Sequence, residues 1–283
     1  MVVMEYLDRR RTLVEDRLED VLSTVEPPAL AQSIDHVMFA GGKRVRPTLT
    51  ILCCEALGGR TADAVDFAAG IELVHTASLV VDDIIDDAAV RRGEQSAWAA
   101  FGVGPAIIAS DGLLGEAFAL FAPNPTALRV VSAAMVELGQ GEAVELVDRP
   151  TTEAEYRELA RRKTGALFKA AAELGAIAAD TNGTNTDAMG EYAERVGIAF
   201  QMRDDVLDAT GAPEQIGKPT GTDAHMNRPS LVEVTAMGPE EALERANEEA
   251  RAAAAALDRI DRLDPTAARY LRDLAAFVVE RDR

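Results

Sequence analysis

Two aspartate clusters with the same spacing, Asp-Asp-x-x-Asp, are the clearest candidates for chemistry in this sequence. The first is Asp-Asp-Ile-Ile-Asp-Asp at residues 82–87, and the second is Asp-Asp-Val-Leu-Asp at residues 204–208. Residues four positions apart lie on one face of a helix, so the first and last aspartates of each motif can bind one cation together. Carboxylates this close repel one another unless a cation neutralises them. Each cluster therefore predicts a metal site.

Hard carboxylate oxygens without nearby histidine or cysteine suit magnesium, which binds a few carboxylates and completes its shell with water and phosphate. The alternative is a solvated acidic face, because the chain carries a net charge of −19. Two copies of one spacing, each at the end of a long apolar helical pattern, weigh against that alternative. The spacing pairs Asp82 with Asp86, and Asp204 with Asp208, as ligands of one cation each, with Asp83 and Asp205 beside them.

Basic residues stand near both clusters, at places where turns would present them. They are Lys43, Arg44 and Arg46 after the glycine pair 41–42, Arg91 and Arg92 after the first cluster, Lys163 within a helical pattern, and Lys218 in a glycine-rich stretch after the second cluster. Arginine holds phosphate through two parallel hydrogen bonds, and lysine adds a mobile point charge. Any one of these groups is most simply a surface charge. Together with the acidic motifs they predict a site for a magnesium-bound diphosphate.

The elements that must position these groups are helices. Glycine and proline breakers divide the chain into stretches of roughly 15 to 25 residues with apolar positions at helical spacing, for example 62–89 and 186–210. Alternating strand patterns are scarce, and no linker or repeat divides the chain. We therefore expect an all-α protein with one domain over residues 1–283.

Composition and charge exclude several other classes of protein. The net charge of −19 argues against a nucleic-acid partner, because such a surface repels phosphates. No run reaches the ~20 uninterrupted apolar residues of a membrane span, and the N-terminus lacks the apolar core of a signal peptide. We expect a cytoplasmic protein without stable membrane insertion, with Cys53 and Cys54 as buried thiols. The 25 arginines against four lysines, on an acidic chain, fit either a salt-loving source or a GC-rich genome.

The sequence resembles the trans-isoprenyl diphosphate synthases of the polyprenyl synthetase family, in particular the geranylgeranyl diphosphate synthases. The matching segments are GGKRVRP at 41–47, ELVHTASLVVDDIIDDAAVRRG at 72–93, GQGEAVEL at 139–146, RRKTGALF at 161–168, FQMRDDVLD at 200–208, GKPTGTDAHMNRPSL at 217–231 and LAAFVVERDR at 274–283. The resemblance implies a helical isoprenoid synthase bundle with a central active-site cavity. It also implies a homodimer.

The resemblance further implies a role for each matching residue. Three magnesium ions, present once substrate is bound, would be held by Asp82, Asp83, Asp86, Asp204 and Asp208. They would bridge to an allylic diphosphate, either dimethylallyl, geranyl or farnesyl diphosphate. That diphosphate would be contacted by Arg91, Lys163, Thr164, Gln201, Lys218 and Arg228. The diphosphate of isopentenyl diphosphate would be bound by Lys43, Arg46, His75 and Arg92. The catalytic set would be Asp82, Asp83, Asp86, Lys163 and Asp204.

The chemistry implied is ionisation of the allylic carbon–oxygen bond, attack by the double bond of isopentenyl diphosphate on the cation, and loss of a proton. Four and five residues before Asp82 stand Ser78 and Ala77, both small, where short-chain members of the family often carry an aromatic residue. A product of C20 or longer is therefore expected, with geranylgeranyl diphosphate as the best single guess. Phe118 or another large residue on a facing helix could still close the channel.

The chain departs from the family pattern at Val81, at residues 94–96, at residues 227–230 and in the short segment 111–139. Two other functions are open. A class I terpene cyclase shares the fold, but such enzymes lack the GGKRxRP site and normally mix other residues into the second metal motif. A non-catalytic subunit of a heteromeric synthase commonly loses aspartates from one motif, and this chain retains both motifs in full.

Overall fold

The computed structural model describes residues 2–181, 183–210 and 229–280, and nearly all of its regular structure is helical. The helices are α1 (Val2–Leu22), α2 (Pro28–Met38), α3 (Val45–Ala56), α4 (Thr61–Ile85), α5 (Ala97–Phe101), α6 (Val103–Phe121), α7 (Pro125–Val147), α8 (Glu153–Ala160), the π-helical turn η1 (Arg161–Gly165), α9 (Ala166–Ala178), α10 (Thr184–Thr210), α13 (Leu231–Thr235), α14 (Pro239–Leu257) and α15 (Pro265–Glu280). Two short strands, β1 (Val90–Arg91) and β2 (Glu94–Gln95), form one hairpin. The predicted all-α class is confirmed.

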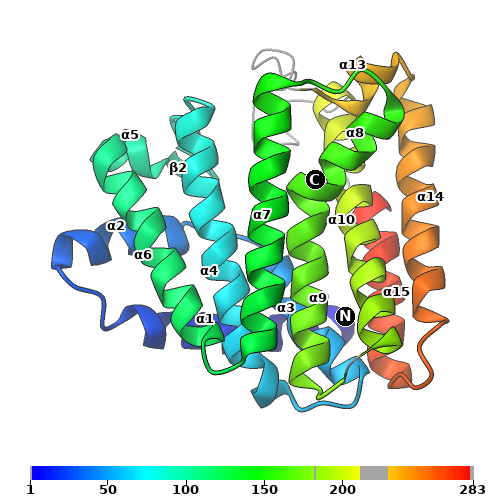
Figure 1. Ribbon diagram of the computed structural model, residues 1–283, viewed down its shortest axis with the longest axis horizontal. Helices are drawn as coiled ribbons and strands as arrows, with labels where there is room; N and C mark the ends of the chain where they lie inside the picture. Colours follow the sequence, from blue (N-terminus) through cyan, green and yellow to red (C-terminus); the bar gives the residue numbers. More distant parts are fainter. Residues whose placement is uncertain (1, 182, 211–228, 281–283) are drawn as a thin grey trace.

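The long helices run side by side as a bundle, in which α4, α7, α9, α10 and α14 stand next to one another (Figure 1). Helix α9 is the centre of the packing, with α3, α4, α7 and α10 around it. Its many alanines and its one glycine, Gly175, let these neighbours approach closely. A Cβ atom on Gly175 would lie only 2.3 Å from the carbonyl oxygen of Thr50 on α3. Small side chains at this crossing are therefore required by the fold.

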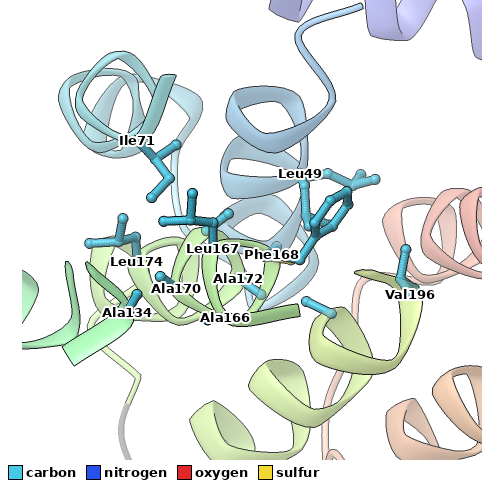
Figure 2. Packing of buried hydrophobic residues seen from close by; sticks show 14 of the residues in the cluster. Leu49, Ile71, Ala134, Ala166, Leu167, Phe168, Ala170, Ala172, Leu174 and Val196 are labelled. Atoms are coloured by element: carbon cyan, nitrogen blue, oxygen red, sulfur yellow. The ribbon is translucent and has the colours of Figure 1, made fainter. Parts of the chain in front are cut away.

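The hydrophobic core surrounds α9 (Figure 2). Figure 2 shows side chains from α3, α4, α7, α9 and α10 meeting there, among them Leu49, Ile71, Ala134, Leu167, Phe168, Leu174 and Val196. Cys53 and Cys54 are buried free thiols in the same core, as expected. Burial raises the pKa of the Cys54 thiol to about 11, so the thiol form is kept at neutral pH.

Helices α4 and α6 are each long and apolar enough to cross a membrane by length and composition alone. They differ in how they are packed. In its most apolar window α4 has 61% of its residues buried inside the bundle, as a core helix does, whereas α6 has only 28% buried. Helix α6 therefore carries an apolar face that the described chain leaves exposed.

Candidate active site

The first aspartate motif lies at the C-terminal end of α4. The helix ends at Ile85, and the backbone N–H of Asp86 donates to the carbonyl of Asp82 at 2.9 Å. The side chains of Asp82 and Asp86 are therefore one turn apart, and both are half-buried. The C-terminal end of a helix has a partial negative charge, which disfavours carboxylates unless cations offset it. This end of α4 suits a bound cation.

The middle aspartate of that motif has different surroundings. Asp83 is 3% exposed, and the Nε of Arg91 lies 2.7 Å from its Oδ1. Arg91 comes from β1, whose hairpin turns through Arg92 and Gly93, both with positive φ. The Asp83–Arg91 ion pair thus ties the hairpin to the end of α4. The roles predicted for the two residues, in metal and diphosphate binding, stay predictions.

The second motif, near the C-terminal end of α10, likewise has two half-buried aspartates and one buried aspartate. Asp204 and Asp208 are half-buried and one turn apart, whereas Asp205 is 2% exposed. Asp205 accepts hydrogen bonds from Tyr156 Oη at 2.5 Å, Gln201 Nε2 at 3.0 Å and the backbone N–H of Leu231 at 2.8 Å. One buried carboxylate therefore joins α8, α10 and α13. Sequence reasoning missed Tyr156, because nothing in its local pattern links it to residues 204–208.

Lys163 is presented by the π-helical turn η1 and faces two glutamates of α7. Its Nζ lies 3.2 Å from Glu142 and also pairs with Glu145. Burial, opposed by the charge of Lys163 and reinforced by Asp82 and Glu145, raises the pKa of Glu142 to about 7. Burial lowers the pKa of Lys163, but Glu145 and Glu142 outweigh that effect, so its pKa lies above the ordinary value. These two glutamates belong to the motif GQGEAVEL, although no role was predicted for them.

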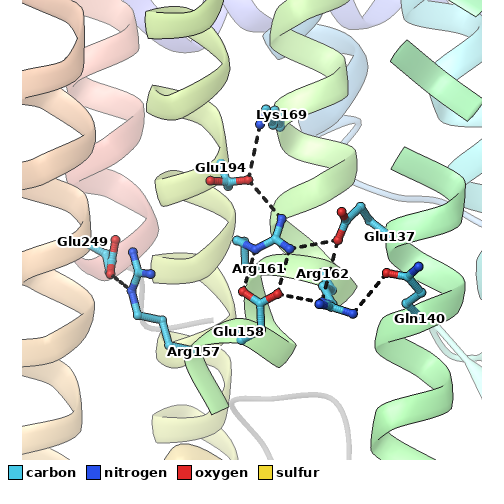
Figure 3. A network of polar contacts seen from close by, with 9 residues as sticks. All are labelled: Glu137, Gln140, Arg157, Glu158, Arg161, Arg162, Lys169, Glu194 and Glu249. Carbon is cyan, nitrogen blue, oxygen red and sulfur yellow. Dashed lines mark hydrogen bonds and ion pairs between the residues drawn. The ribbon is translucent and has the colours of Figure 1, made fainter. Parts of the chain in front are cut away.

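An ion-pair network surrounds η1 (Figure 3). Arg161 lies 2.9 Å from Glu137 of α7, 2.8 Å from Glu158 of α8 and 3.5 Å from Glu194 of α10. Arg162 pairs with the same Glu158 at 2.7 Å. π-Helical turns are rare and are often found at functional sites. Here the network links the turn to three helices and so orients Lys163, which follows directly in the sequence.

Thr164 and Gln201, both predicted to contact the allylic diphosphate, are hydrogen-bonded to each other. Thr164 Oγ1 donates to Gln201 Oε1 at 2.8 Å, and Gln201 Nε2 donates to Asp205. A continuous path therefore runs from Tyr156 through Asp205 and Gln201 to η1. This path holds the turn that carries Lys163 against the helix that carries the second aspartate motif.

A basic cluster forms a second site beside α4. Arg46 Nη1 lies 3.0 Å from His75 Nε2. Burial, and then the charge of Arg46 and other arginines, holds the pKa of His75 well below its usual range. His75 is therefore neutral and accepts the hydrogen bond from Arg46. Burial also lowers the pKa of Arg46 to about 10, and Glu72 partly offsets this effect.

The glycine pair completes this basic cluster. Arg92 donates a hydrogen bond to the carbonyl of Gly41. At Gly42, φ is +137°, and a Cβ atom there would lie 2.8 Å from an Arg92 nitrogen. The positive φ favours glycine at this position, and the Arg92 guanidinium fills the space beside it. Lys43 follows and is exposed. Arg46 and Arg92 both lie near His75, and the role of these groups in binding isopentenyl diphosphate stays a prediction.

The residues predicted to set product length lie on α4. Ala77 is buried against α6, where Ser110 Oγ donates to its carbonyl oxygen at 3.1 Å. Ser78 is half-buried, and its hydroxyl donates to the carbonyl of His75 at 2.8 Å. Phe118, considered above as a residue that could close the channel, is instead exposed on α6.

A buried aromatic residue three positions further along α6 does face α4. Phe121 is wholly buried, and a Cβ atom at Gly70 of α4 would lie 2.5 Å from its ring. Gly70 and Ala77 are seven residues apart, so they lie on the same side of α4. Phe121 is therefore the large residue on the facing helix, about 10 Å below Ala77 along the helix axis.

Two predicted residues, Lys218 and Arg228, lie outside the described residues, as do the departures at 227 and 228. The hydroxyl of Ser230 accepts from the backbone N–H of Glu233 at 3.3 Å and so caps α13. In the parts of the chain that the structure describes, no group of three or more His, Cys, Asp or Glu side chains closes around a single metal position. Paired carboxylates that leave coordination positions for water and phosphate fit magnesium.

The C-terminal ends of α4, α7 and α10 lie toward the same end of the bundle, the upper end in Figure 1. Two cationic groups, Lys163 and the basic cluster, thus accompany two pairs of carboxylates on a helical scaffold. The family model for polyprenyl synthetase matches residues 27–262. The chain therefore belongs to the polyprenyl synthetase family, and the predicted enzyme class, an isoprenyl diphosphate synthase, is confirmed.

Similar proteins include both sequences and solved structures. A short chain isoprenyl diphosphate synthase of Methanothermobacter thermautotrophicus is 37% identical over 260 residues, which are 89% of this chain and 78% of that protein. A geranylgeranyl diphosphate synthase of Methanosarcina mazei is 32% identical over 83% of this chain and 76% of that protein. The crystal structure of geranylgeranyl pyrophosphate synthetase from Pyrococcus horikoshii has a TM-score of 0.91 at 31% identity, covering 99% of this chain and 98% of that chain.

Proposed function

We propose that this prenyltransferase condenses isopentenyl diphosphate with an allylic diphosphate to form geranylgeranyl diphosphate, with magnesium as cofactor. The observation that carries the proposal is the presence of two cationic groups on separate elements. Lys163 on η1 stands near the Asp82 carboxylate, and the Arg46–His75 pair stands between α3 and α4. A condensation of two diphosphates needs two such places.

The allylic diphosphate is assigned to the side of Lys163. The Asp82–Asp86 and Asp204–Asp208 pairs would hold magnesium, which would stabilise the negative charge that builds on the departing diphosphate. Lys163 would add a fixed positive charge there once the diphosphate replaces its glutamate partners. The apolar walls of the bundle would keep water away from the allylic cation.

Isopentenyl diphosphate is assigned to the basic cluster of Lys43, Arg46, His75 and Arg92. Neutral His75 can donate a hydrogen bond through its other ring nitrogen, while the arginines supply charge. This second site favours the synthase over a terpene cyclase, which binds one diphosphate. The complete aspartate motifs favour it over a non-catalytic subunit.

A C20 product is supported by small residues at 77 and 78 and by the names of the relatives from Methanosarcina mazei and Pyrococcus horikoshii. In this proposal the growing chain would pass Ala77 and would end near Phe121, which is buried against Gly70 and lies deeper than an aromatic residue at position 77 would. The proposal covers dimethylallyl, geranyl and farnesyl diphosphates as primers.

The same proposal includes a homodimer. Exposed apolar side chains follow α6 and continue on α7, namely Val103, Ile107, Ile108 and Phe118 with Val136. Exposed apolar side chains on a protein with net charge −19 suit a self-complementary interface, since two identical faces meet about a twofold axis. A second copy on this face is also consistent with a cytoplasmic protein without membrane insertion.

The dimer can be tested by molar mass in solution. Ile108→Glu should convert a dimer to a monomer by light scattering, because a buried unpaired carboxylate disfavours association. Phe277→Glu makes a similar change at an exposed residue of α15 and should leave the mass unchanged. A monomeric wild type, or a dimeric Ile108→Glu variant, would contradict the proposal.

The activity is tested by incubating the purified protein with isopentenyl and dimethylallyl diphosphates, with and without magnesium. Release of diphosphate with a C20 product by mass spectrometry supports the proposal. Hydrocarbon products would indicate a cyclase, and inactivity of the protein alone would indicate a subunit. Undiminished activity after removal of divalent cations with a chelator would contradict the metal assignment.

A further inference from the structure

Arg44 and Glu72 form a buried ion pair close to the basic cluster. Arg44 Nη1 lies 2.7 Å from Glu72 Oε1, and the side chains are 2% and 3% exposed. Arg44 Nη2 also donates to the carbonyl of Met38 at 2.6 Å. Arg44 was counted among the basic residues near the aspartate clusters, but the family resemblance gave neither Arg44 nor Glu72 a substrate contact. A buried pair often contributes little net stability, because desolvation offsets the attraction, so its location is the informative feature.

The backbone of Arg44 has an unusual conformation. Its φ of 49° and ψ of 41° are left-handed, which is unfavourable for a residue with a side chain, and it immediately precedes α3. Surrounding contacts must hold such a residue, and the Glu72 and Met38 contacts do so. Lys43 precedes Arg44 and Arg46 follows two positions later. The direction in which both cations leave the backbone therefore depends on Arg44.

Glu72 also acts on the cluster through its charge. It lies on α4, one turn before His75, and faces the same group of arginines. Burial lowers the pKa of Arg46 and of Arg92, and the Glu72 charge opposes this effect in both. One buried carboxylate therefore serves as counter-ion for several cations while no diphosphate is bound.

We propose that Arg44 and Glu72 are positioning residues for the diphosphate of isopentenyl diphosphate, and the proposal rests on the assignment of that substrate to the basic cluster. Their ion pair holds the stretch 39–44 against α4, so that Lys43, Arg46 and Arg92 converge before the substrate arrives. The allylic site proposed above, at Lys163 and the two aspartate motifs, includes the C-terminal end of α4, ten residues and about 15 Å along the helix axis from Glu72. Loss of the pair should therefore affect one substrate only.

The test is Glu72→Gln, which keeps the shape of the side chain and removes its charge. Its matched control is Glu249→Gln, because Glu249 is also a buried carboxylate in ion pairs, with Arg157 and Arg195, but lies on α14. In Glu72→Gln, KM for isopentenyl diphosphate should rise about tenfold or more, while KM for dimethylallyl diphosphate changes less than about twofold. In Glu249→Gln, both KM values should change less than about twofold, even where the melting temperature falls.

If Glu72 acted only through its charge, Glu72→Gln would change KM for isopentenyl diphosphate in the opposite direction. Removing a negative charge beside a diphosphate site would lower KM for isopentenyl diphosphate, so a lowered or unchanged value would overturn the proposal. Equal increases for both substrates would also overturn it. If Glu72→Gln does not fold, the double variant Arg44→Met/Glu72→Leu fills the same space with apolar side chains and should fold. It should show the same selective rise in KM.

Two further variants separate this proposal from the site assignment beneath it. Lys43→Ala and Arg46→Ala should raise KM for isopentenyl diphosphate if the basic cluster binds it. If neither variant does so, the assignment of the cluster is wrong. If Lys43→Ala and Arg46→Ala raise this KM but the variants of Glu72 do not, the basic cluster binds isopentenyl diphosphate. The positioning role of the Arg44–Glu72 pair is then wrong.

Discussion

The Lys163 ammonium group lies 3.2 Å from a carboxylate oxygen of Glu142, one helix away on α7. Glu145 pairs with the same nitrogen, so the lysine is neutralised by two carboxylates before any substrate binds. A diphosphate entering this place must displace both. The charges of Glu142 and Glu145 on α7 therefore affect the site proposed for the allylic substrate.

The stability of the substrate-free protein should depend on pH through Glu142. Burial raises the pKa of this carboxyl from 4.5 to about 7 in the folded protein. Between these values the folded state binds more protons than the unfolded state, so the free energy of unfolding falls as pH rises. Glu142→Gln should remove a fall on the order of 1–3 kcal/mol. Thermal unfolding between pH 4.5 and 8 without metal measures this pH dependence. The control is Glu19→Gln, because Glu19 is exposed on α1. Parallel profiles for wild type and Glu142→Gln would contradict the prediction.

Asp82→Asn and Asp86→Asn should each lower turnover about a hundredfold or more, which corresponds to ~3 kcal/mol of activation free energy. Both carboxylates are needed on one cation, and removal of one leaves the core intact. The melting temperatures of these two variants should therefore be the same as that of the wild type. Asp87→Asn is the control, because asparagine tolerates the left-handed backbone of Asp87. Near-normal turnover in either of the first two variants would show that the metal site lies elsewhere.

Tyr156→Phe should lower turnover more than Tyr192→Phe does. Both tyrosines are buried and donate one hydrogen bond, Tyr156 to Asp205 at 2.5 Å and Tyr192 to the carbonyl of Leu271 at 2.8 Å. Each loss should cost about 1–2 kcal/mol of stability, measured by denaturant unfolding. Only the first disturbs the hydrogen-bonded path to η1. Equal turnover in the two variants at equal stability would limit Tyr156 to a structural role.

Ala77→Phe should shift the main product from C20 toward C15, as measured by mass spectrometry of the products. Ala77 lies on α4 where this helix contacts α6. An aromatic ring at this position would stand about 10 Å above Phe121 along the helix axis. Phe121→Ala should have the opposite effect, because it removes the ring packed on Gly70. A wild type that already stops at C15, or an unchanged product in Ala77→Phe, would show that this side of α4 does not set the length.

Activity and melting temperature should rise between low and molar potassium chloride if the acidic composition is an adaptation to salt. Salt screens the mutual repulsion of a chain with net charge −19. It also weakens ion pairs such as Arg161–Glu137, so a rise means that the general repulsion dominates. A flat response over this range would favour the GC-rich genome as the cause of the arginine bias.

Much of this protein is determined locally and could be predicted from the sequence. Apolar spacing and breakers determine the helices, because helical hydrogen bonds join residues four apart. The same periodicity places Asp82 with Asp86, and Asp204 with Asp208, on one helix face. Glycine at position 42 follows from its backbone conformation. These features depend on a few neighbouring residues, so the printed sequence contains what they need.

Other features were decided only by the packing of helices that are distant in the sequence. Asp83 and Asp205 have the same place in their motifs, yet one pairs with Arg91 and the other accepts from Tyr156. No local pattern specifies these partners. The meeting of Glu142 with Lys163 also required the arrangement of α7 against η1, because a side chain's partner depends on which face of another helix is turned toward it.

The rotation of α6 gives the same lesson for apolar residues. Phe118 and Phe121 are three residues apart on one helix, and both could face α4 as judged from spacing. The structure buries Phe121 against Gly70 and leaves Phe118 exposed. Only the contact between the two helices selects one of them, because a buried ring needs a hollow of its own size and the glycine of α4 supplies it.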